Sequence, residues 1–196
     1  MPNKVKYGLK NVHFSNITFG SDGTPTFATP VAIPGAVNIS LSKQGDSDTF
    51  YADDGVYFEV ANEAGYEGDL EIALIPEAFR TGPLGETLDN KGVLVESTGA
   101  TKGHFALLFE FAADAKAIRH VLYNCTASQN EVAGETKGEN TTVQTEKLNI
   151  KAKPLPDGKL KAKTGDTPDN TTYEGWYDSV YLTAAASQSG GSGTTT

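Results

Sequence analysis

The chain has 196 residues, of which 38% are hydrophobic, and it carries a formal net charge of −9 at pH 7. This length can bury one sizeable core, and the negative charge argues against a protein that grips nucleic acid, because phosphate binding depends on lysine and arginine. No apolar run approaches the roughly 20 residues that cross a bilayer. No apolar segment follows the basic residues near the N-terminus, so we expect no membrane contact, no secretory signal, and synthesis in a cytoplasm.

No residue pattern predicts catalysis or a cofactor. His13, His104 and His120 lack the mutual spacing of a zinc site, and the sequence has no Gly-rich phosphate loop and no nucleophile elbow. Cys125, the single cysteine, lies in an alternating apolar run and is expected to be buried. We therefore expect a protein that is not an enzyme and that needs neither a cofactor nor a metal.

The N-terminal part predicts strands joined by turns. Two short strands, 5–7 and 11–19, are expected on either side of Gly8, with a bulge where the apolar alternation slips near Ser15. Residues 37–42 alternate cleanly between apolar and polar side chains, which is typical of a strand with one buried face.

The next segment predicts a hairpin, a strand and a helix. Aromatic residues flank the sequence Asp53-Asp54-Gly55, which predicts two strands and their connection. Residues 70–74 alternate, with Leu70, Ile72 and Leu74 on one face. Proline and glutamate at positions 76 and 77 then begin a short helix that Gly82-Pro83 ends.

The second half of the chain is again rich in strand patterns. The expected strands are 93–95, 104–111, 118–127, 142–153, 160–163 and 173–182. Phe105, Leu107, Phe109 and Phe111 share one face of the second of these. Together the elements predict a mainly β protein, a β-sandwich or barrel-like fold with a short flanking α-helix. We expect one domain over residues 1–183 and a flexible Gly/Ser/Thr-rich tail over 184–196.

Acidic and basic residues are segregated along the chain. Residues 43–71 hold nine acidic residues against Lys43 alone, whereas 146–163 hold six lysines against two acids. Both segments coincide with predicted strands. They form either two ordinary solvated sheet faces or complementary surfaces for self-assembly.

Several segments, in this order, resemble the major tail proteins of siphophages that infect Gram-positive bacteria. They are 50–54 (FYADD), 65–70 (GYEGDL), 75–79 (IPEAF), 84–85 (LG), 105–111 (FALLFEF) and 119–125 (RHVLYNC). The likeness covers roughly residues 5–165 and leaves out the tail. It implies a tail-tube fold, sixfold rings stacked into a tube, and passage of double-stranded DNA through the lumen without specific binding.

The resemblance also implies partners and a place in the virion. The protein would assemble with itself, contact the tape-measure and tail terminator proteins, and be made in the host cytoplasm before it enters the tail. Alternatives of the same class are another phage ring or decoration protein and a secretion tube. An alternative of another class is a monomeric carbohydrate-binding β-sandwich, with Trp176, Tyr173 and Tyr177 as an exposed stacking platform.

Under this resemblance the hairpin segment supplies both kinds of candidate site. Acids in the lumen wall would repel DNA, which carries about one charge per 1.7 Å of axis. The candidate lumen-facing acids are Asp46, Asp48, Asp53, Asp54 and Glu59. The candidate inter-subunit residues are Phe50, Tyr51, Tyr57 and Phe58. We expect a long hairpin over 43–61 that is poorly ordered alone and orders on polymerisation.

Overall fold

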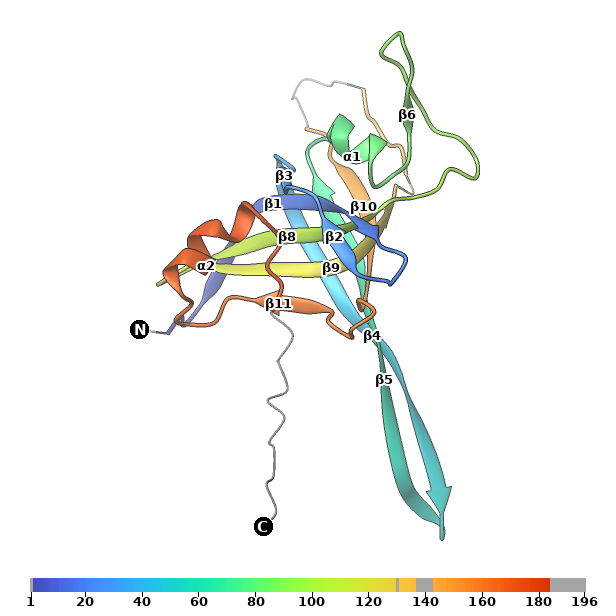
Figure 1. Ribbon diagram of the computed structural model, residues 1–196, viewed down its shortest axis with the longest axis vertical. Helices are drawn as coiled ribbons and strands as arrows, with labels where there is room; N and C mark the ends of the chain where they lie inside the picture. The colour runs from blue at the N-terminus through green and yellow to red at the C-terminus, as the bar shows by residue number, and fades with distance from the viewer. Residues whose placement is uncertain (1, 130, 137–142, 184–196) are drawn as a thin grey trace, which may run out of the picture.

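A computed structural model shows the chain built around one large antiparallel sheet from which a long hairpin projects (Figure 1). The structure describes residues 2–129, 131–136 and 143–183. At positions 46–48 and 59–63 it describes the strand and not the surroundings of the side chains. The expected flexible tail, 184–196, lies outside the described residues.

Nine strands form the main sheet, in the order β2-β1-β8-β9-β10-β5-β4, with β3 paired to β1 and β11 paired to β9. Their bounds are β1 Lys6–Phe19, β2 Pro25–Phe27, β3 Val31–Ala32, β4 Ala36–Ala52, β5 Gly55–Ile72, β8 His104–Ala113, β9 Ile118–Ser128, β10 Glu146–Lys153 and β11 Lys161–Lys163. A separate pair consists of β6 Thr87–Leu88 and β7 Leu94–Val95. The helices are α1 Glu77–Thr81, α2 Asn170–Glu174 and the 3₁₀ turn η1 Gly175–Tyr177.

Strands β8 and β9 occupy the middle of the sheet and are buried on both faces. Phe105 and Leu107 of β8 point into one cluster, with Leu122 of β9, while Ala106 and Leu108 point into the other. Successive side chains of a strand face opposite sides, so two layers cover this pair. The expectation of a mainly β, sandwich-like fold is confirmed. Within the described chain the sheet does not close, because β4 pairs only with β5.

The first cluster fills the concave side of the curled sheet and is covered at one end by α1. Phe79, the buried residue of this helix, meets Phe14 and Phe105 edge to face, with ring centroids 5.0 and 5.2 Å apart. This geometry suits the ring quadrupoles. The short helix expected after Pro76 is therefore confirmed, and its one buried side chain, Phe79, attaches it to the core.

The second cluster covers the convex face of β8 and β9 and uses the C-terminal segment. Trp176 is only 3% exposed and stacks on Tyr181 at 5.5 Å. Leu155, from the loop between β10 and β11, lies in the same cluster. Residues that follow the last strand thus provide the second layer of the sandwich.

Three predictions for the N-terminal half are wrong in detail. Residues 6–19 form one strand instead of two, because Gly8 (φ 62°) and Asn11 (φ 50°) adopt left-handed conformations at register shifts without ending it. The bulges lie there and not near Ser15, which pairs regularly with Ala106. Leu74 is 68% exposed because β5 ends two residues earlier.

The strand expected over 173–182 is also wrong, because the chain forms α2 and η1 there. The carboxylate of Asp169 accepts a hydrogen bond from the backbone N–H of Thr172 at 3.0 Å, which caps the helix. This local cap starts a helical turn within a segment whose aromatic content favours a strand.

The root of the hairpin depends on Gly65. This residue has a φ of +139°, and a Cβ there would overlap the carbonyl oxygen of Ala152 on β10. We expect Gly65→Ala to reduce the free energy of unfolding by more than about 1 kcal/mol, measured by urea denaturation. Gly165→Ala is the matched control, because a Cβ at position 165 meets open space. Equal losses for the two variants would contradict the steric explanation.

Candidate assembly surfaces and an amphipathic cavity

Strands β4 and β5 extend well beyond the sheet as a two-stranded arm, as the long hairpin in Figure 1 shows. Pairing between β10 and β5 stops at Ala152 and Tyr66, so from there to the tip β4 is the only described strand that pairs with β5. The arm runs from Gln44 to Ala52 on β4, which is about 30 Å at about 3.3 Å per residue. The long hairpin expected from the sequence is therefore present, and its degree of order in solution stays a prediction.

The tip of the arm is a tight turn. Asp53 and Asp54 have φ values of 53° and 58°, both in the left-handed region, and Ala52 pairs directly with Gly55. A two-residue hairpin turn with both φ values positive is the type I′ form, which matches the twist of the strands. Aspartate tolerates this conformation better than most residues. The turn therefore consists of the two aspartates, and Gly55 begins the returning strand.

Large apolar side chains cover both faces of the tip. Phe50 lies opposite Phe58 and Tyr51 lies opposite Val56, with Tyr57 as the extra residue at a register shift. These five side chains are 60–72% exposed. The Phe50 and Tyr57 rings meet edge to face at 6.3 Å, but the arm is too thin to bury them. All four residues predicted to contact another subunit thus lie together on an exposed surface.

The candidate lumen acids do not all gather in one place. Asp53 and Asp54 form the exposed turn at the tip. Asp46, Asp48 and Glu59 lie on the two strands of the arm, paired with Asn62, Val60 and Thr49 respectively. The surroundings of these three side chains lie outside the described residues.

Acidic and basic segments meet inside one molecule, which corrects part of the sequence interpretation. Strands β5 and β10 are neighbours, and their register places Lys147 opposite Glu71 and Lys151 opposite Glu67. Lys151 Nζ and Glu67 Oε1 are 2.9 Å apart. Opposite charges across a strand pair stabilise the sheet modestly. Part of the expected complementarity is therefore satisfied within the chain and is not available for assembly.

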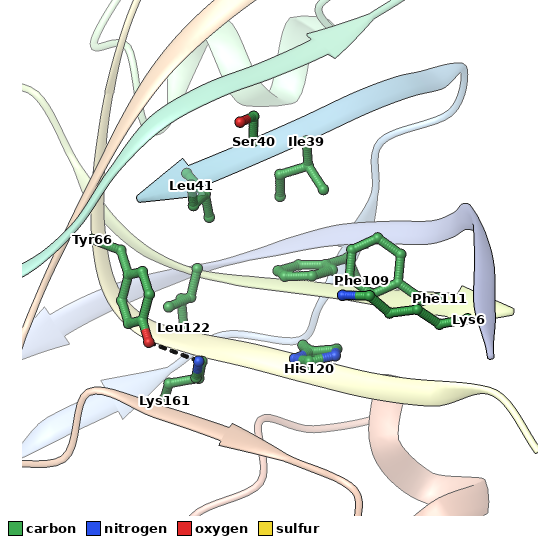
Figure 2. Close-up of a pocket in the computed structure, with 10 residues that line it drawn as sticks. All are labelled: Lys6, Ile39, Ser40, Leu41, Tyr66, Phe109, Phe111, His120, Leu122 and Lys161. Atoms are coloured by element: carbon green, nitrogen blue, oxygen red, sulfur yellow. Dashed lines mark hydrogen bonds between the residues drawn. The ribbon is translucent and has the colours of Figure 1, made fainter. Parts of the chain in front are cut away.

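An amphipathic cavity of about 360 Å³ opens at the end of the curled sheet where the arm begins (Figure 2). Apolar and polar groups contribute about equally to its lining, and the polar groups lie around the aromatic rings. The lining residues are Lys6, Ile39, Ser40, Leu41, Tyr66, Phe109, Phe111, His120, Leu122 and Lys161. They come from β1, β4, β5, β8, β9 and β11, so no local sequence pattern could have identified this site.

Aromatic residues hold the two lysines of the cavity. Lys161 Nζ donates a hydrogen bond to the hydroxyl of Tyr66 at 2.8 Å and lies 4.5 Å from its ring centroid. Lys6 Nζ lies 4.6 Å from the ring centroid of Phe111. Both contacts bring cations against ring faces, where the quadrupole attracts them. The cavity therefore combines apolar walls with positive charge.

His120 stacks on Phe109 in the same cavity, with ring centroids 5.1 Å apart and planes within 5°. Burial, followed by the charges of Lys161, Lys6 and Lys163, lowers the pKa of His120 from 6.5 to about 4. The imidazole is consequently neutral at physiological pH, and the positive charge of the cavity comes from the lysines.

A polar network attaches α2 and η1 to the sheet. Glu110 is buried and accepts hydrogen bonds from Arg119 Nε at 3.0 Å and from the Tyr177 hydroxyl at 3.2 Å. The Arg119 guanidinium also lies 3.8 Å from the ring centroid of Tyr173. Because Trp176 is buried as well, these aromatics are not an exposed stacking platform. The carbohydrate-binding alternative loses the feature that supported it.

Other sites considered from the sequence stay structural. Cys125 is buried, as predicted, and burial raises the pKa of its thiol to about 12. Among the described residues there is no group of three or more His, Cys, Asp or Glu side chains that could hold a metal ion. In the same part of the chain, no helix has the length and apolarity needed to cross a membrane.

The low pKa of His120 makes folding sensitive to acid. The unfolded chain takes up a proton near pH 6.5 whereas the folded chain does so only near pH 4, so wild-type stability falls as the pH drops through this window. We expect His120→Gln to lose less stability than the wild type between pH 7 and pH 4.5, measured from urea midpoints. His104→Gln, at an exposed histidine, is the matched control. Equal pH slopes for the wild type and His120→Gln would contradict a neutral His120.

Comparison with known families agrees with the architecture. A family model described as "Phage tail tube protein" matches residues 2–179, which is most of the 196-residue chain and includes the arm, the sheet and the cavity. No curated protein matches the chain. The match agrees with the predicted resemblance and indicates a structural component of the virion tail that assembles into a tube. The chain therefore belongs to the phage tail tube protein family.

Proposed function

We propose that this protein polymerises into hexameric rings that stack into the phage tail tube, the conduit through which double-stranded DNA leaves the capsid. Membership of the tail tube family supports the tube. Six subunits per ring and the conduit role rest on the resemblance found in the sequence. In this proposal the protein has no catalytic role, and residues 1–183 act as one unit to which the tail, 184–196, is appended.

The exposed tip of the arm is the observation that best supports polymerisation. Five large apolar side chains lie on both faces of a hairpin that has only two strands. Such a hairpin is marginal in water, and an exposed apolar patch marks an interaction surface. A contact between the arm and a different surface of the next copy is heterologous, and repeated heterologous contacts generate rings or filaments.

The outer edge of β4 supports lateral contact between subunits. Across the described residues no strand of the chain pairs with this edge. An unpaired edge is a template for another strand, and β4 is 17 residues long. In our proposal a neighbouring subunit covers part of this edge and thereby protects the monomer surface that is most prone to aggregation.

The charge balance supports a lumen wall drawn from the arm. Glu67 of β5 pairs with a lysine of β10, and Glu71 lies opposite another. Among the described residues, the lysine-rich β10 does not extend along the arm, because its pairing with β5 ends at the arm root. In our proposal a wall rich in acids repels DNA phosphates and lets the genome slide past.

The partners at the two ends of the tube remain part of the proposal. A tape-measure protein would occupy the lumen during assembly, and a tail terminator protein would stop growth. Both follow from the family resemblance. We further propose that the subunit is made in the host cytoplasm and enters the virion only as part of the tail.

The lumen assignment predicts a result for the assembled tube. We expect a cryo-EM map of the polymer to place Asp46 and Asp48, which stand two residues apart on β4 and therefore at the same face of the arm, on the channel wall. Replacing both with lysine should slow DNA release from virions, because the wall would then attract phosphate. A map with both residues on the outer surface of the tube would contradict the assignment.

The tip aromatics should be needed for assembly and not for folding. We expect Tyr51→Ser with Phe58→Ser to abolish tubes in electron micrographs and to leave the melting temperature of the monomer unchanged, because both side chains are exposed. Val93→Ser, which alters an exposed apolar residue on the turn between β6 and β7, is the matched control.

Hydrogen exchange tests the same prediction without a mutation. Amides of residues 50–58 should exchange quickly in the monomer and slowly in the tube, because a neighbour supplies the missing contacts. Slow exchange in the free monomer, or fast exchange in the tube, would overturn the assembly role of the arm. If the monomer of the Tyr51→Ser/Phe58→Ser variant is unfolded, these two side chains stabilise the fold and their role in assembly is contradicted.

A further inference from the structure

We propose that the amphipathic cavity at the arm root is the receptor for the arm tip of a second copy of this chain. The inference rests on the proposed polymerisation and assigns the surface that the tip contacts. In this contact the aromatic side chains of the tip enter the cavity, and the Asp53 and Asp54 carboxylates meet the lysines at its rim.

The apolar parts of the two surfaces match in kind. The tip presents aromatic side chains that the arm itself cannot bury, and the cavity presents Phe109 and Phe111 with three aliphatic side chains. Ile39, Leu41 and Phe111 are only partly buried and lie at the margin of the core. Covering them removes apolar surface from water on both partners at once.

The charges of the two surfaces are opposite. Two exposed aspartates form the turn at the tip. Lys6 and Lys161 lie at the cavity, both exposed, and aromatic contacts hold their ammonium groups there. The described cavity lining includes no carboxylate. The neutral His120 ring stacks on Phe109 and adds to the aromatic surface of the cavity. Such complementarity steers association and fixes its register.

The cavity has the size and position that this occupant requires. Its volume of about 360 Å³ is roughly ten times the share of one water molecule in the liquid, which is enough for an aromatic side chain. Apolar hollows with a few polar groups are also common binding positions. The cavity is therefore large enough for part of the tip and too small for a whole protein segment.

The same molecule cannot fill its own cavity. Leu41 and Tyr66 line it and stand at the root of the arm, whereas the tip lies about 30 Å away along straight paired strands (Figure 1). A second copy that is displaced by about one arm length along the arm presents its cavity at the tip of the first. Repetition of this step produces an open series of head-to-tail contacts.

This contact narrows the candidate lumen set. A carboxylate that faces a lysine inside a neighbouring subunit does not face DNA, so Asp53 and Asp54 become interface residues. Asp46, Asp48 and Glu59 then remain as the candidates for the channel wall.

Charge exchange tests the contact directly. We compare purified wild-type protein with Asp53→Lys/Asp54→Lys, with Lys6→Glu/Lys161→Glu, and with the chain that carries all four changes. Each double variant should raise the critical concentration for polymerisation by about tenfold or more, and the quadruple variant should restore tubes. Lys91→Glu/Lys102→Glu, at two exposed lysines away from the cavity, is the matched control and should assemble normally.

The outcomes separate this contact from the proposed function. If the wild type forms neither rings nor tubes, the proposed function fails. If the wild type polymerises and the Lys6→Glu/Lys161→Glu variant does so equally well, only the cavity contact is overturned. A quadruple variant that stays monomeric also overturns it, provided that its melting temperature matches the wild type.

Cross-linking gives a second test that does not depend on rescue. Cys125 is buried, so single cysteines added at exposed positions report on contacts without interference from it. Tubes made from a mixture of Asp54→Cys and Lys161→Cys chains should form disulfide-linked dimers under mild oxidation. Lys91→Cys in place of Lys161→Cys should not. Equal yields from the two mixtures would overturn the contact.

Discussion

Burial of the β8–β9 pair on both faces is the constraint on which the rest of the structure depends. The concave side closes because the sheet curls over Phe105 and Leu107 and α1 adds Phe79. The convex side closes because Trp176 and its neighbours cover Ala106 and Leu108. With both layers anchored on these two strands, the core is complete without any contribution from the arm. The arm is therefore free to carry residues that suit a partner instead of the fold.

The root of the arm is where these two roles separate. From Tyr66 to Ile72, β5 lies between β4 and β10 and forms backbone hydrogen bonds with both. From Gly65 to the tip, the arm has two strands, and no other strand of the described chain pairs with it. Gly65 stands at this point in a conformation that brings its backbone against the Ala152 carbonyl, so β10 can end its pairing while β4 and β5 continue. We therefore expect local stability to be higher in the body than in the arm.

Local patterns in the sequence predicted local features well. The turn at Asp53-Asp54 could be predicted because turn chemistry and alternation act over a few residues. The helix at Asn170–Glu174 was not predicted: the pattern indicated a strand over 173–182, whereas the Asp169 cap starts a helix in the structure. The cavity could not be predicted, because topology alone brings Lys6, His120 and Lys161 together from three strands. The pairing of Lys151 with Glu67 could not be predicted either, because it depends on β10 and β5 being neighbours in the sheet.

The distribution of charge gives the arm a selectivity that apolar contacts alone could not supply. Exposed aromatic tips with free strand edges would otherwise pair with one another, which is the usual hazard of such edges. Two aspartates at every tip make tip-to-tip contact a meeting of like charges, which is unfavourable. A cavity with Lys6 and Lys161 and no carboxylate in its described lining offers the opposite sign. Because the cationic β10 lysines are already matched by acids of β5, they compete weakly for the tip. In the proposed assembly, repulsion between tips and attraction to the cavity favour the ordered head-to-tail contact over aggregation.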